Sequence, residues 1–592
     1  MFRRKTIYSI IKNHANQFPK SNAILGLDKN ALTYSQLLDQ LNSVAGILNG
    51  IGIEKNDRVA IVLENGPDMA VCFLAVAAYA ASAPLNPAYG FEDYDFYFSD
   101  LNAKAVILRL GKDSPARRVA QMLEMPIIEL ENKPGSNAGA FDLRTDKQGS
   151  GKKVEFSGGD DNALILHTSG TTSRPKIVPL TNGNLTASAG HISETLKLSR
   201  DDCCLNVMPL FHIHGLMGAL LSTINAGGSI VCCPGFDSTQ FYNWLQVFHP
   251  TWYSAVPTMH QAVLSGADDH LEIISNSDLR FIRSSSASLP PSVMQSLEEL
   301  FNCPVIESYG MTEASHQMTS NPLPPGKRKP GSVGIPAGPE VGILDNKSNL
   351  LGPNEEGEIV IRGPNVTLGY ENNPDANRSA FTKNWFRTGD LGKIDEDGYL
   401  YISGRIKEII NRGGEKIAPR EIDEVFLSHP DVVQAVSFAV PHPTLGEDLA
   451  TAVILAPSAN ITDLDLRSYA FDRLPDFKVP SRVIILDQIP KGPTGKLQRI
   501  GLAEKLASQM AVDYTAARNN TEAKLTRVWE KVLGIEKVGV FDNFFFIGGD
   551  SLSAIQVVVE IKDIFSLELS TNFIFKYPTI AQLAKYIDEL DR

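Results

Sequence analysis

Short β-branched runs alternate with longer helical patterns between about residues 1 and 400 of the chain. RVAIVL at 58–63 and NALILH at 162–167 are two of the apolar runs, and the stretch 32–49 has helical spacing. This alternation is typical of α/β domains, in which helices cover the strands that they connect. We therefore predict an α/β fold for this region. A chain of 592 residues is too long for one hydrophobic core, which favours roughly three or four domains.

The sequence pattern changes after Gly404. Residues 405–500 have a small, charged α+β pattern, and the polar stretch after Ser508 is typical of a linker. Helical patterns fill the rest of the chain. The predicted divisions are a large N-terminal domain of several subdomains at 1–403, a small α+β domain at 404–507, a linker at 508–520 and an all-α domain at 521–592.

Charge and cysteine content restrict the class of function. The net charge of −13 argues against general binding to nucleic acid or to an anionic membrane, because both need a basic face. The six cysteines form no CxxC pair, so we predict reduced, mostly buried thiols and no zinc site. The N-terminus has no secretory apolar run, and Met69–Ala81 is too short to span a bilayer. We therefore predict a buried helix there and a cytoplasmic location.

A loop rich in glycine and hydroxyl residues follows the apolar run at 162–167. Thr168–Lys176 reads TSGTTSRPK, and its backbone N–H groups, hydroxyls and lysine can surround the oxygens of a mobile polyphosphate. It does not match the Walker pattern GxxxxGK[ST]. An ordinary Gly/Ser turn is the alternative, and the loop by itself does not decide between the two.

Three later motifs also carry polar side chains that suit nucleotide chemistry. Glu307–Glu313 (ESYGMTE) could stack on a base and hold Mg²⁺, or it could be a strand end followed by a helix cap. Asp390 could accept both hydroxyls of a ribose, although an Asp in a TGD stretch is usually a turn residue. Lys496 could offset charge on a phosphate or carboxylate, although a lone lysine is more often a solvated surface residue.

Taken together and in their order along the chain, these motifs are a much more specific indication of function than any one of them alone. TSGTTSRPK, YGMTE, TGD, GRIKEIINRGGEKI and PKGPTGK closely resemble the successive core motifs of the adenylate-forming superfamily, which includes acyl-CoA synthetases, adenylation domains and luciferases. The resemblance covers about residues 8–505. Ser173 and Ile177 depart from it, because both stand where glycine is common. The resemblance implies that ATP, Mg²⁺ and a carboxylic acid give an acyl-adenylate and pyrophosphate, and that a thiol then takes the acyl group.

The same resemblance implies roles for individual residues. The nucleotide contacts would come from Thr168, Ser169, Gly170, Thr171, Thr172, Lys176, Ala287, Glu307, Ser308, Tyr309, Thr312, Asp390, Arg405 and Lys496. The catalytic set would be Lys496, Thr312, Glu313 and His212, with Glu313 on Mg²⁺ and Lys496 bridging the substrate carboxylate and the α-phosphate. The small domain would rotate about a hinge at Lys407 and bring Gly413 and Gly414 beside the thiol channel.

The C-terminal segment carries a second signature. Phe545–Leu552 (FFIGGDSL) is similar to the phosphopantetheine attachment motif of acyl and peptidyl carrier domains, which are four-helix domains. Ser551 would carry the group at a helix N-terminus, where free N–H groups suit a phosphodiester. A serine N-cap after a Gly-Gly turn is the alternative. The resemblance implies a phosphopantetheinyl transferase as one partner and a downstream enzyme that takes the acyl group as another.

The identity of the acid depends on other motifs. Amino-acid adenylation domains place an Asp near MPLFHIHG, and this motif has none, since Asp237 lies outside it. MPLFHIHGL, WYSAVPTMHQ, LRFIRSSSASL and MTEASHQMTSNPLPPGKRKPGSVG look like the oxalate–CoA ligase group of plants and fungi. That resemblance implies a small polar acid, with oxalate as the best candidate. Four residues would bind its distal carboxylate: His212, His214, Ser286 and His316.

The fused carrier is a departure from the oxalate–CoA ligase pattern, because a ligase that makes only free oxalyl-CoA does not need one. The acceptor could therefore be the phosphopantetheine on Ser551, free CoA, or both. One alternative is a CoA ligase with a vestigial carrier. Another is an adenylation-carrier didomain for aryl, fatty or amino acids in a pathway of the nonribosomal-peptide or polyketide type. The last is a catalytically dead carrier or docking protein.

Overall fold

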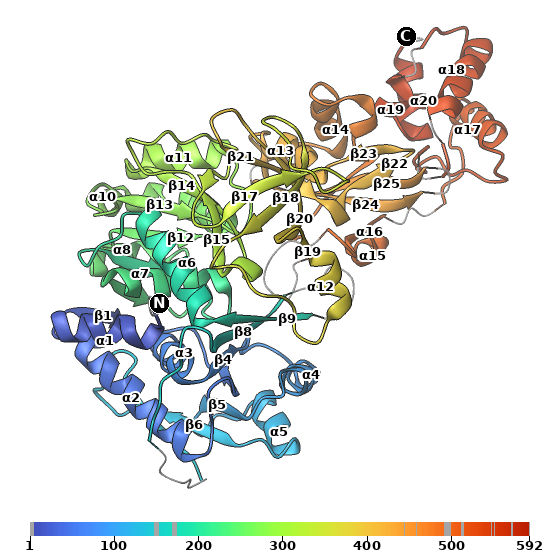
Figure 1. The fold of residues 1–592 in the computed structure, drawn as a ribbon. Helices are drawn as coiled ribbons and strands as arrows, with labels where there is room; N and C mark the ends of the chain where they lie inside the picture. The colour runs from blue at the N-terminus through green and yellow to red at the C-terminus, as the bar shows by residue number, and fades with distance from the viewer. Residues whose placement is uncertain are drawn as a thin grey trace. The chain divides into compact units, whose positions relative to one another are not determined.

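The computed structural model describes residues 5–146, 153–168, 175–442, 445–457, 459–490, 499–510, 514–545, 547–549, 551–569 and 572–590. The chain divides into two compact units. The large unit comprises residues 1–388 and 392–402, and the C-terminal unit comprises residues 389–391 and 403–592. The predicted α/β class with an all-α segment at the C-terminal end is confirmed (Figure 1).

The large unit contains a nine-stranded sheet that positions most of the candidate site. From one edge to the other its strands are β16 (Ile335–Pro336), β15 (His316–Ser320), β14 (Val305–Met311), β13 (Phe281–Ser284), β12 (Trp252–Ala255), β10 (Cys203–Asn206), β11 (Ser229–Cys232), β1 (Asn22–Leu25) and β2 (Leu32–Thr33). The strands from β14 to β1 are parallel. The segments that follow β10, β12, β13 and β14 therefore meet at one edge.

Side chains alternate between the two faces of this sheet, as the strand period of two requires. Trp252 and Phe281 belong to the core cluster on one face, and Tyr253 and Ile282 belong to the cluster on the other. The first face packs against α6 (Asn182–Thr195), the π-helix η1 (His214–Leu221) and α7 (Ser222–Ala226). The second face packs against α8 (Gln240–Phe248), α9 (Pro257–Ser265), α10 (Leu271–Ser275) and α11 (Pro291–Phe301).

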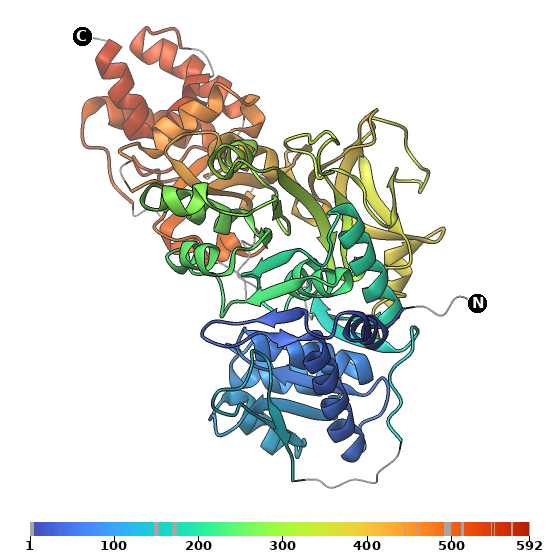
Figure 2. The same ribbon diagram turned by 90° about the vertical axis from the view of Figure 1, so that its left-hand side faces the viewer.

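A seven-stranded sheet forms a second layer of the large unit. Its strands, in order, are β7 (Asp142–Arg144), β6 (Ile127–Glu131), β5 (Ala105–Arg109), β3 (Arg58–Val62), β4 (Ala81–Pro84), β8 (Asn162–Thr168) and β9 (Lys176–Thr181). The helices of this region are α2 (Tyr34–Gly50), α3 (Pro67–Tyr79), α4 (Phe91–Leu101) and α5 (Pro115–Met122). Figure 2 shows the blue helices lying against this layer.

Helix α3 confirms the prediction of a buried helix near Met69–Ala81, and every residue from Asp68 to Tyr79 is buried. No helix in the described ranges has the length and apolar character to cross a membrane. All six cysteines are free and five of them are buried, as predicted. The predicted helix at 32–49 begins two residues later, because Leu32 and Thr33 pair in β2 and Thr33 caps α2.

Smaller elements complete the large unit. A five-stranded sheet contains β17 (Glu340–Leu344), β18 (Gly357–Arg362), β20 (Trp385–Ile394), β19 (Phe381–Thr382) and β21 (Leu400–Arg405). Residues 389–391 of β20 and 403–405 of β21 belong to the C-terminal unit. The remaining helices are α1 (Ile7–Gln17), α12 (Pro374–Ala380) and the 3₁₀ turns η2 (Asp268–His270) and η3 (Thr312–Ala314).

The C-terminal unit begins with a small α+β domain. Its sheet contains β23 (Glu415–Ile417), β22 (Ile410–Arg412), β25 (Gly446–Leu455), β24 (Val432–His442) and β26 (Arg482–Ile485). Its helices are α13 (Pro419–Leu427), α14 (Asp463–Phe471), α15 (Leu502–Lys505), α16 (Ala507–Met510) and the 3₁₀ turns η4 (Ile406–Glu408) and η5 (Asp476–Lys478).

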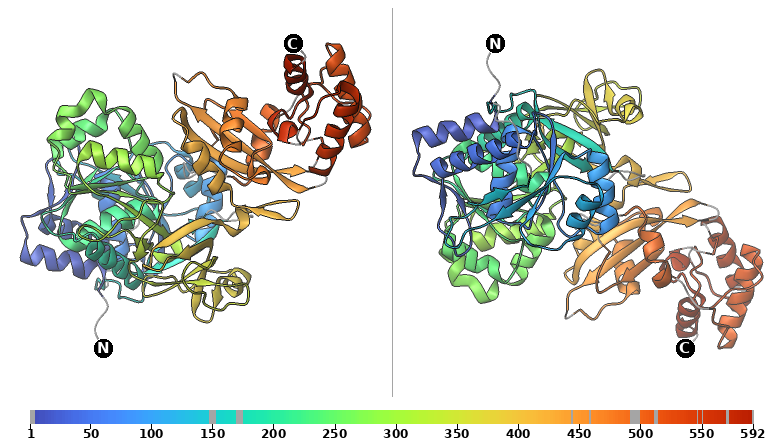
Figure 3. Two further views of the ribbon diagram at one scale, coloured as in Figure 1. Left: turned by 90° about the horizontal axis from the view of Figure 1, so that it is seen from above. Right: turned by 90° about the horizontal axis from the view of Figure 1, so that it is seen from below.

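Four helices follow in the described ranges and lie together at the C-terminal end of the chain (Figure 3), and their buried side chains form a separate core. They are α17 (Asn520–Leu533), α18 (Ser551–Phe565), α19 (Asn572–Lys576) and α20 (Ile580–Leu590). Leu525, Val528 and Trp529 line the buried face of α17, at the spacing of an amphipathic helix. Each such fully buried side chain contributes about 1.5–3 kcal/mol. We call this four-helix segment the carrier segment.

Candidate active site

Most predicted site residues of the large unit lie at the carboxyl edge of the nine-stranded sheet. His212 and His214 follow β10, Ser286 and Ala287 follow β13, and Glu307–Thr312 overlaps the end of β14. In open α/β sheets, ligands bind outside the carboxyl ends of the strands. The topology therefore gathers segments that are about 100 residues apart in the sequence at one place where a ligand fits.

His214 is the first residue of the π-helix η1 and is buried. Its Nδ1 lies 3.0 Å from Oγ of Ser286, and its Nε2 lies 2.7 Å from Oγ of Ser254. Its ring stacks on the ring of His316, with centroids 5.0 Å apart and planes 22° apart. The structure thus brings three of the four predicted substrate residues into one cluster, beside a π-helical turn of the kind often found at functional sites.

Arg283 joins this cluster and is fully buried. It lies beside Ser254 in the register of β12 and β13, so both side chains leave the same face of the sheet. Its Nη1 donates to Nε2 of His316 at 3.0 Å and to Oγ of Ser254 at 3.4 Å, and its Nη2 donates to Oε1 of Gln317 at 3.2 Å. Its Nε has no hydrogen-bond partner among the residues that the structure describes.

All of these partners of Arg283 are uncharged groups, and no carboxylate in the described part of the chain forms an ion pair with it. Burial lowers the pKa of Arg283 to about 10, so the guanidinium stays protonated at neutral pH. A buried charge without a counter-charge is strongly unfavourable. The cluster therefore has the electrostatics of a site for an anion.

Backbone strain marks the same cluster. Ser286 has φ +73° and His316 has φ +94°, which is the left-handed region that favours glycine. Such strain occurs most often at ligand sites, where the surrounding structure maintains it. Two glycines make room for His316: a Cβ on Gly218 would lie 2.5 Å from its Nε2, and one on Gly310 would lie 1.9 Å from its carbonyl oxygen.

Four of the predicted nucleotide contacts differ in how far they are exposed. Glu307 and Ser308 are buried, and Oε1 of Glu307 accepts from the backbone N–H of Leu289 at 2.9 Å. Tyr309 is half-buried and Ala287 is exposed. Glu307 and Ser308 are therefore parts of the wall, while Tyr309 and Ala287 offer surface to a ligand.

Glu313 is buried in the turn η3, which begins at the partly buried Thr312. Its Oε1 accepts a hydrogen bond of 2.8 Å from the hydroxyl of Tyr370, and Nζ of Lys176 lies 4.3 Å from the centroid of the Tyr370 ring. Burial and the Glu313 charge both raise the pKa of Tyr370 well above its usual range, so the hydroxyl stays a donor. Tyr370 thus joins the predicted magnesium residue to the predicted phosphate lysine.

Two predicted loops lie outside the described residues. The first contains Ser169, Gly170, Thr171 and Thr172, and the second contains Lys496. The ends of the first loop are described, and they form a β-hairpin in which Thr168 pairs with Lys176. The described residues contain no group of three or more His, Cys, Asp or Glu side chains that could hold a metal. The donor set at Glu313 fits Mg²⁺, which usually takes one or two carboxylates together with substrate phosphates.

The remaining predicted adenylation residues lie in the C-terminal unit. Oδ1 of Asp390 forms an ion pair with Nε of Arg405 at 3.2 Å, and Asp390 is buried. Lys407 is exposed in the turn η4. Gly413 and Gly414 make the turn between β22 and β23 with φ +59° and +96°, which a residue with a side chain adopts only with strain. The structure thus pairs the predicted ribose residue Asp390 with Arg405, another predicted nucleotide contact.

In the carrier segment, helix α18 begins at Ser551, as predicted. Gly548 and Gly549 precede it, and a Cβ on Gly549 would lie 2.4 Å from the Phe544 ring. The Ser551 side chain lies outside the described atoms. The position of its backbone fits a phosphodiester at a helix N-terminus.

His212 and Asp237 are two further residues that bear on the choice of the substrate acid. His212 is partly buried, and its ring centroid is 4.6 Å from that of Phe211. Asp237 is exposed, and its Oδ1 accepts from the N–H groups of Thr239 and Gln240 at the start of α8. Asp237 therefore binds backbone N–H groups in the turn before α8, which agrees with its exclusion as an amine ligand.

Comparison with protein families decides what kind of protein carries this site. A model described as AMP-binding enzyme matches residues 11–371, and one described as AMP-binding enzyme C-terminal domain matches residues 421–496. A third, described as phosphopantetheine attachment site, matches residues 523–587.

The chain belongs to the AMP-binding enzyme family.

It is an adenylate-forming acid–thiol ligase with a C-terminal phosphopantetheine attachment domain.

Named relatives and solved structures agree with this membership. The oxalate–CoA ligase of Arabidopsis thaliana is 44% identical over 500 residues, which are 83% of this chain and 97% of that protein. The ATP-bound crystal structure of MatB from Rhodopseudomonas palustris has a TM-score of 0.74 and 30% identity, over 84% of this chain and 99% of that one. The McyG A-PCP structure, complexed with phenylalanyl-adenylate, has a TM-score of 0.76 over 99% of this chain, and at 20% identity it supports the fold alone.

Sequence reasoning missed three residues of the site: Arg283, Ser254 and Tyr370. Arg283 lies inside the motif LRFIRSSSASL, directly before the run of hydroxyl residues that contains Ser286. An arginine at the carboxyl end of an apolar strand was the available signal, because a charge in a buried strand needs a partner. Tyr370 lies 57 residues from Glu313 in the sequence, and nothing in the sequence connects them.

Proposed function

We propose that this ligase activates a small dicarboxylic acid, with oxalate as the best candidate, and transfers the acyl group to a thiol. The observation that carries the proposal is the buried Arg283, which is protonated and has only uncharged partners. The second carboxylate of a dicarboxylic acid would provide the missing counter-charge. His214, Ser286 and Ser254 would add hydrogen bonds to the same carboxylate.

This arrangement disfavours the other acid classes. A fatty or aryl acid would place apolar groups against Arg283 and leave its charge unpaired, which is costly in a buried site. An amino acid would need a carboxylate for its amine, and Asp237 is exposed and accepts instead from backbone N–H groups at the start of α8. The 44% identity with an oxalate–CoA ligase supports oxalate within the class of small dicarboxylates.

In the first half-reaction, a carboxylate oxygen of the acid would attack the α-phosphorus of ATP. The bond between the α-phosphorus and the bridging oxygen would break, giving an acyl-adenylate and pyrophosphate. The protein contributes positioning and charge neutralisation rather than covalent chemistry. Thr168–Lys176 would hold the leaving pyrophosphate, Thr312 would contact the α-phosphate, and Glu313 would hold Mg²⁺. Lys496 would bridge the substrate carboxylate and the α-phosphate.

In the second half-reaction, a thiolate would attack the acyl carbon, and the bond between that carbon and the AMP oxygen would break. Phosphopantetheine, when attached to Ser551, supplies such a thiol, and free CoA supplies the same group. Asp390 and Arg405 would hold the ribose through the reaction. Gly413 and Gly414 would let the backbone approach the pantetheine arm closely after rotation about Lys407. The proposed partners are a phosphopantetheinyl transferase and an enzyme that takes the acyl group from the carrier segment.

Intact-protein mass spectrometry tests both the acid and the acceptor. The holo protein is incubated with ATP, Mg²⁺ and oxalate, and CoA thioesters are quantified in a parallel reaction. We expect one oxalyl group on the wild type and none on Ser551→Ala, which should still consume ATP when CoA is supplied. An unmodified wild-type carrier together with normal CoA thioester formation would contradict loading of Ser551 and favour the vestigial-carrier alternative.

A further inference from the structure

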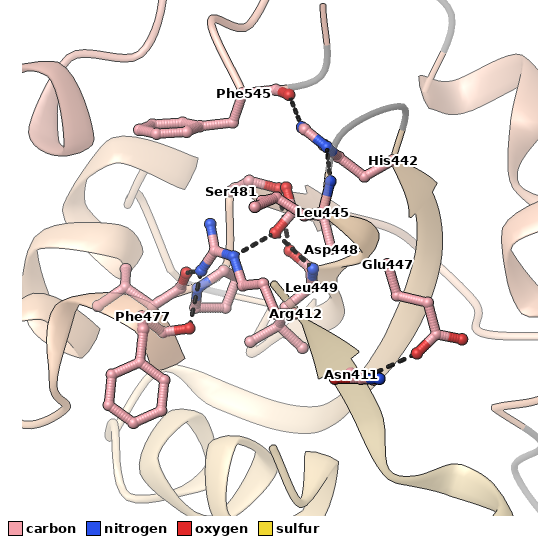
Figure 4. A network of polar contacts seen from close by, with 12 residues as sticks. Asn411, Arg412, His442, Leu445, Glu447, Asp448, Leu449, Phe477, Ser481 and Phe545 are labelled. Atoms are coloured by element: carbon pink, nitrogen blue, oxygen red, sulfur yellow. Dashed lines mark hydrogen bonds and ion pairs between the residues drawn. The ribbon is translucent and has the colours of Figure 1, made fainter. Parts of the chain in front are cut away.

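The carrier segment and the small α+β domain share a buried polar contact within the C-terminal unit (Figure 4). Nε2 of His442, at the end of β24, forms a hydrogen bond with the carbonyl oxygen of Phe545. Nδ2 of Asn543 donates to the carbonyl oxygen of Ser481 at 2.7 Å. His442, Phe545, Asn543 and Ser481 are all buried, so these bonds form where water is excluded.

The hydrogen-bond pattern assigns the tautomer of His442. Its Nδ1 accepts from the backbone N–H of Leu445 at 3.1 Å. A backbone N–H can only donate and a carbonyl can only accept, so Nε2 carries the proton and donates to Phe545. The imidazole is thus a specific bridge, with one nitrogen bound to its own hairpin and the other to the carrier segment.

The bridge continues to the glycine turn of the small domain. The carbonyl oxygen of Leu445 accepts from the N–H of Gly413 at 3.0 Å. The residue before that turn is fixed as well: Nε of Arg412 lies 2.8 Å from Oδ1 of the fully buried Asp448, and Nη1 of Arg412 donates to the carbonyl oxygen of Phe477. An unbroken chain of hydrogen bonds therefore leads from Gly413 through Leu445 and His442 to Phe545, and Figure 4 shows its part from Leu445 to Phe545.

The carrier end of this chain is close to the attachment serine in sequence. Asn543 and Phe545 lie in the segment that leads to α18, and Oδ1 of Asn543 accepts from the N–H of Phe545 at 3.0 Å. The N–H groups of Gly548 and Gly549 bond back to the carbonyl oxygens of Phe545 and Phe544. The segment is a compact turn, so a contact that holds Phe545 also restrains the start of α18, at Ser551.

We propose that His442 is a positioning residue that docks the carrier segment on the small domain, so that both move as one body when Ser551 is loaded. This inference rests on the proposed function, since it assumes that the small domain rotates between half-reactions. Docking restricts the positions that Ser551 can take and keeps Ser551 at a fixed position relative to the turn at Gly413. The surface of the small domain around His442 and Ser481 therefore binds the carrier segment of the same chain.

Two variants break the contact from opposite sides. His442→Asn keeps an acceptor for the Leu445 N–H but is too short to reach Phe545. Asn543→Asp keeps the acceptor for the Phe545 N–H but places an oxygen against the Ser481 carbonyl. His429→Asn is the matched control, because Nδ1 of His429 likewise accepts a backbone N–H, from Asp431 at 3.1 Å, and its ring packs on Tyr469.

The first readout needs no substrate. Amide hydrogen exchange of the full-length holo protein is followed in peptides covering residues 432–442 and 540–549. We expect faster exchange in both peptides for His442→Asn and Asn543→Asp, with unchanged exchange in α17 and α20, and wild-type exchange for His429→Asn. Wild-type exchange in both interface variants would overturn the docking, whatever the protein catalyses.

The second readout is single-turnover acylation of Ser551 compared with acylation of free CoA. Loss of one buried hydrogen bond predicts a fall of about tenfold in acylation of Ser551 for both interface variants. ATP–pyrophosphate exchange and CoA acylation should stay at wild-type rates. Equal or faster acylation of Ser551 in the variants would overturn the positioning role. A wild-type protein that is inactive in all of these reactions would instead count against the proposed function. Amide hydrogen exchange would still test the contact between His442 and Phe545.

Discussion

Arg283 and His316 share a hydrogen bond of 3.0 Å between Nη1 and Nε2, inside the large unit. A guanidinium only donates, so Nε2 of His316 is the acceptor and its ring is unprotonated at that nitrogen. The histidine therefore orients the cation without neutralising it. The positive charge stays available for an anionic ligand, and this is the feature on which the choice of a dicarboxylic acid depends.

Replacing Arg283 by glutamine should abolish selectivity for a dicarboxylic acid. Loss of a buried partner for a substrate carboxylate costs about 2–5 kcal/mol, so kcat/KM for oxalate should fall by a factor of about 30 or more. Activity with acetate should change little, since acetate has no second carboxylate. ATP–pyrophosphate exchange with each acid measures this. Equal losses with oxalate and acetate would show that Arg283 supports the fold rather than the acid.

Gly218→Ala should disturb the two stacked histidines. The new Cβ would lie 2.5 Å from Nε2 of His316 and 2.9 Å from Cδ2 of His214, so the rings must shift. Overpacking of this kind typically costs about 1–3 kcal/mol of stability, and exchange with oxalate should fall with it. Thermal unfolding and exchange assays measure the two effects.

Gly190→Ala is the control for that substitution. Gly190 lies inside helix α6, and a Cβ there would meet nothing within 4 Å. Alanine should raise stability by about 0.5–1 kcal/mol, because it reduces the freedom of the unfolded chain. Loss of oxalate activity in Gly190→Ala as large as that in Gly218→Ala would contradict the steric explanation.

Tyr370→Phe should weaken the support of Glu313. The change removes a hydrogen bond of 2.8 Å to the carboxylate while leaving the ring beside Lys176. A hydrogen bond to a charged group is worth about 1.5–3 kcal/mol, so the concentration of Mg²⁺ needed for half-maximal rate should rise roughly 10-fold or more. The KM for oxalate should be unaffected. A changed KM for oxalate with an unchanged Mg²⁺ requirement would assign Tyr370 to the acid site instead.

Acid should destabilise the large unit through His260. Burial lowers the pKa of His260 to about 3, whereas an unfolded histidine titrates near roughly 6.5. The unfolded chain therefore binds the proton first, so this contribution to stability is complete above about pH 6.5 and declines as pH falls toward 3. His260→Phe should flatten the decline, which melting temperatures between about pH 7 and 4.5 would reveal. A decline of unchanged slope in His260→Phe would assign the acid sensitivity to other groups.

Much of the fold could be predicted because it follows local patterns. The apolar run at Met69–Ala81 predicted α3, and the start of α18 at Ser551 followed from the Gly-Gly turn before it. The anion site could not be predicted in the same way. The Arg283 side chain could lie on the face of the sheet that packs against η1 or on the opposite face, and the strand register decides which. Its neighbour Ser254 belongs to a different strand. The contact of His442 with Phe545 joins segments 103 residues apart, which no local pattern reveals.

ATP–pyrophosphate exchange with a panel of acids tests the central claim most directly. The panel contains oxalate, malonate, succinate, glyoxylate, benzoates, medium-chain fatty acids and amino acids. The buried Arg283, whose described partners are all uncharged, predicts that exchange is strongest with oxalate and weak with every acid that lacks a second carboxylate or an equivalent polar group. Strong exchange with a fatty, aryl or amino acid, and none with any dicarboxylic acid, would contradict the account of Arg283, His214 and His316 as the acid site.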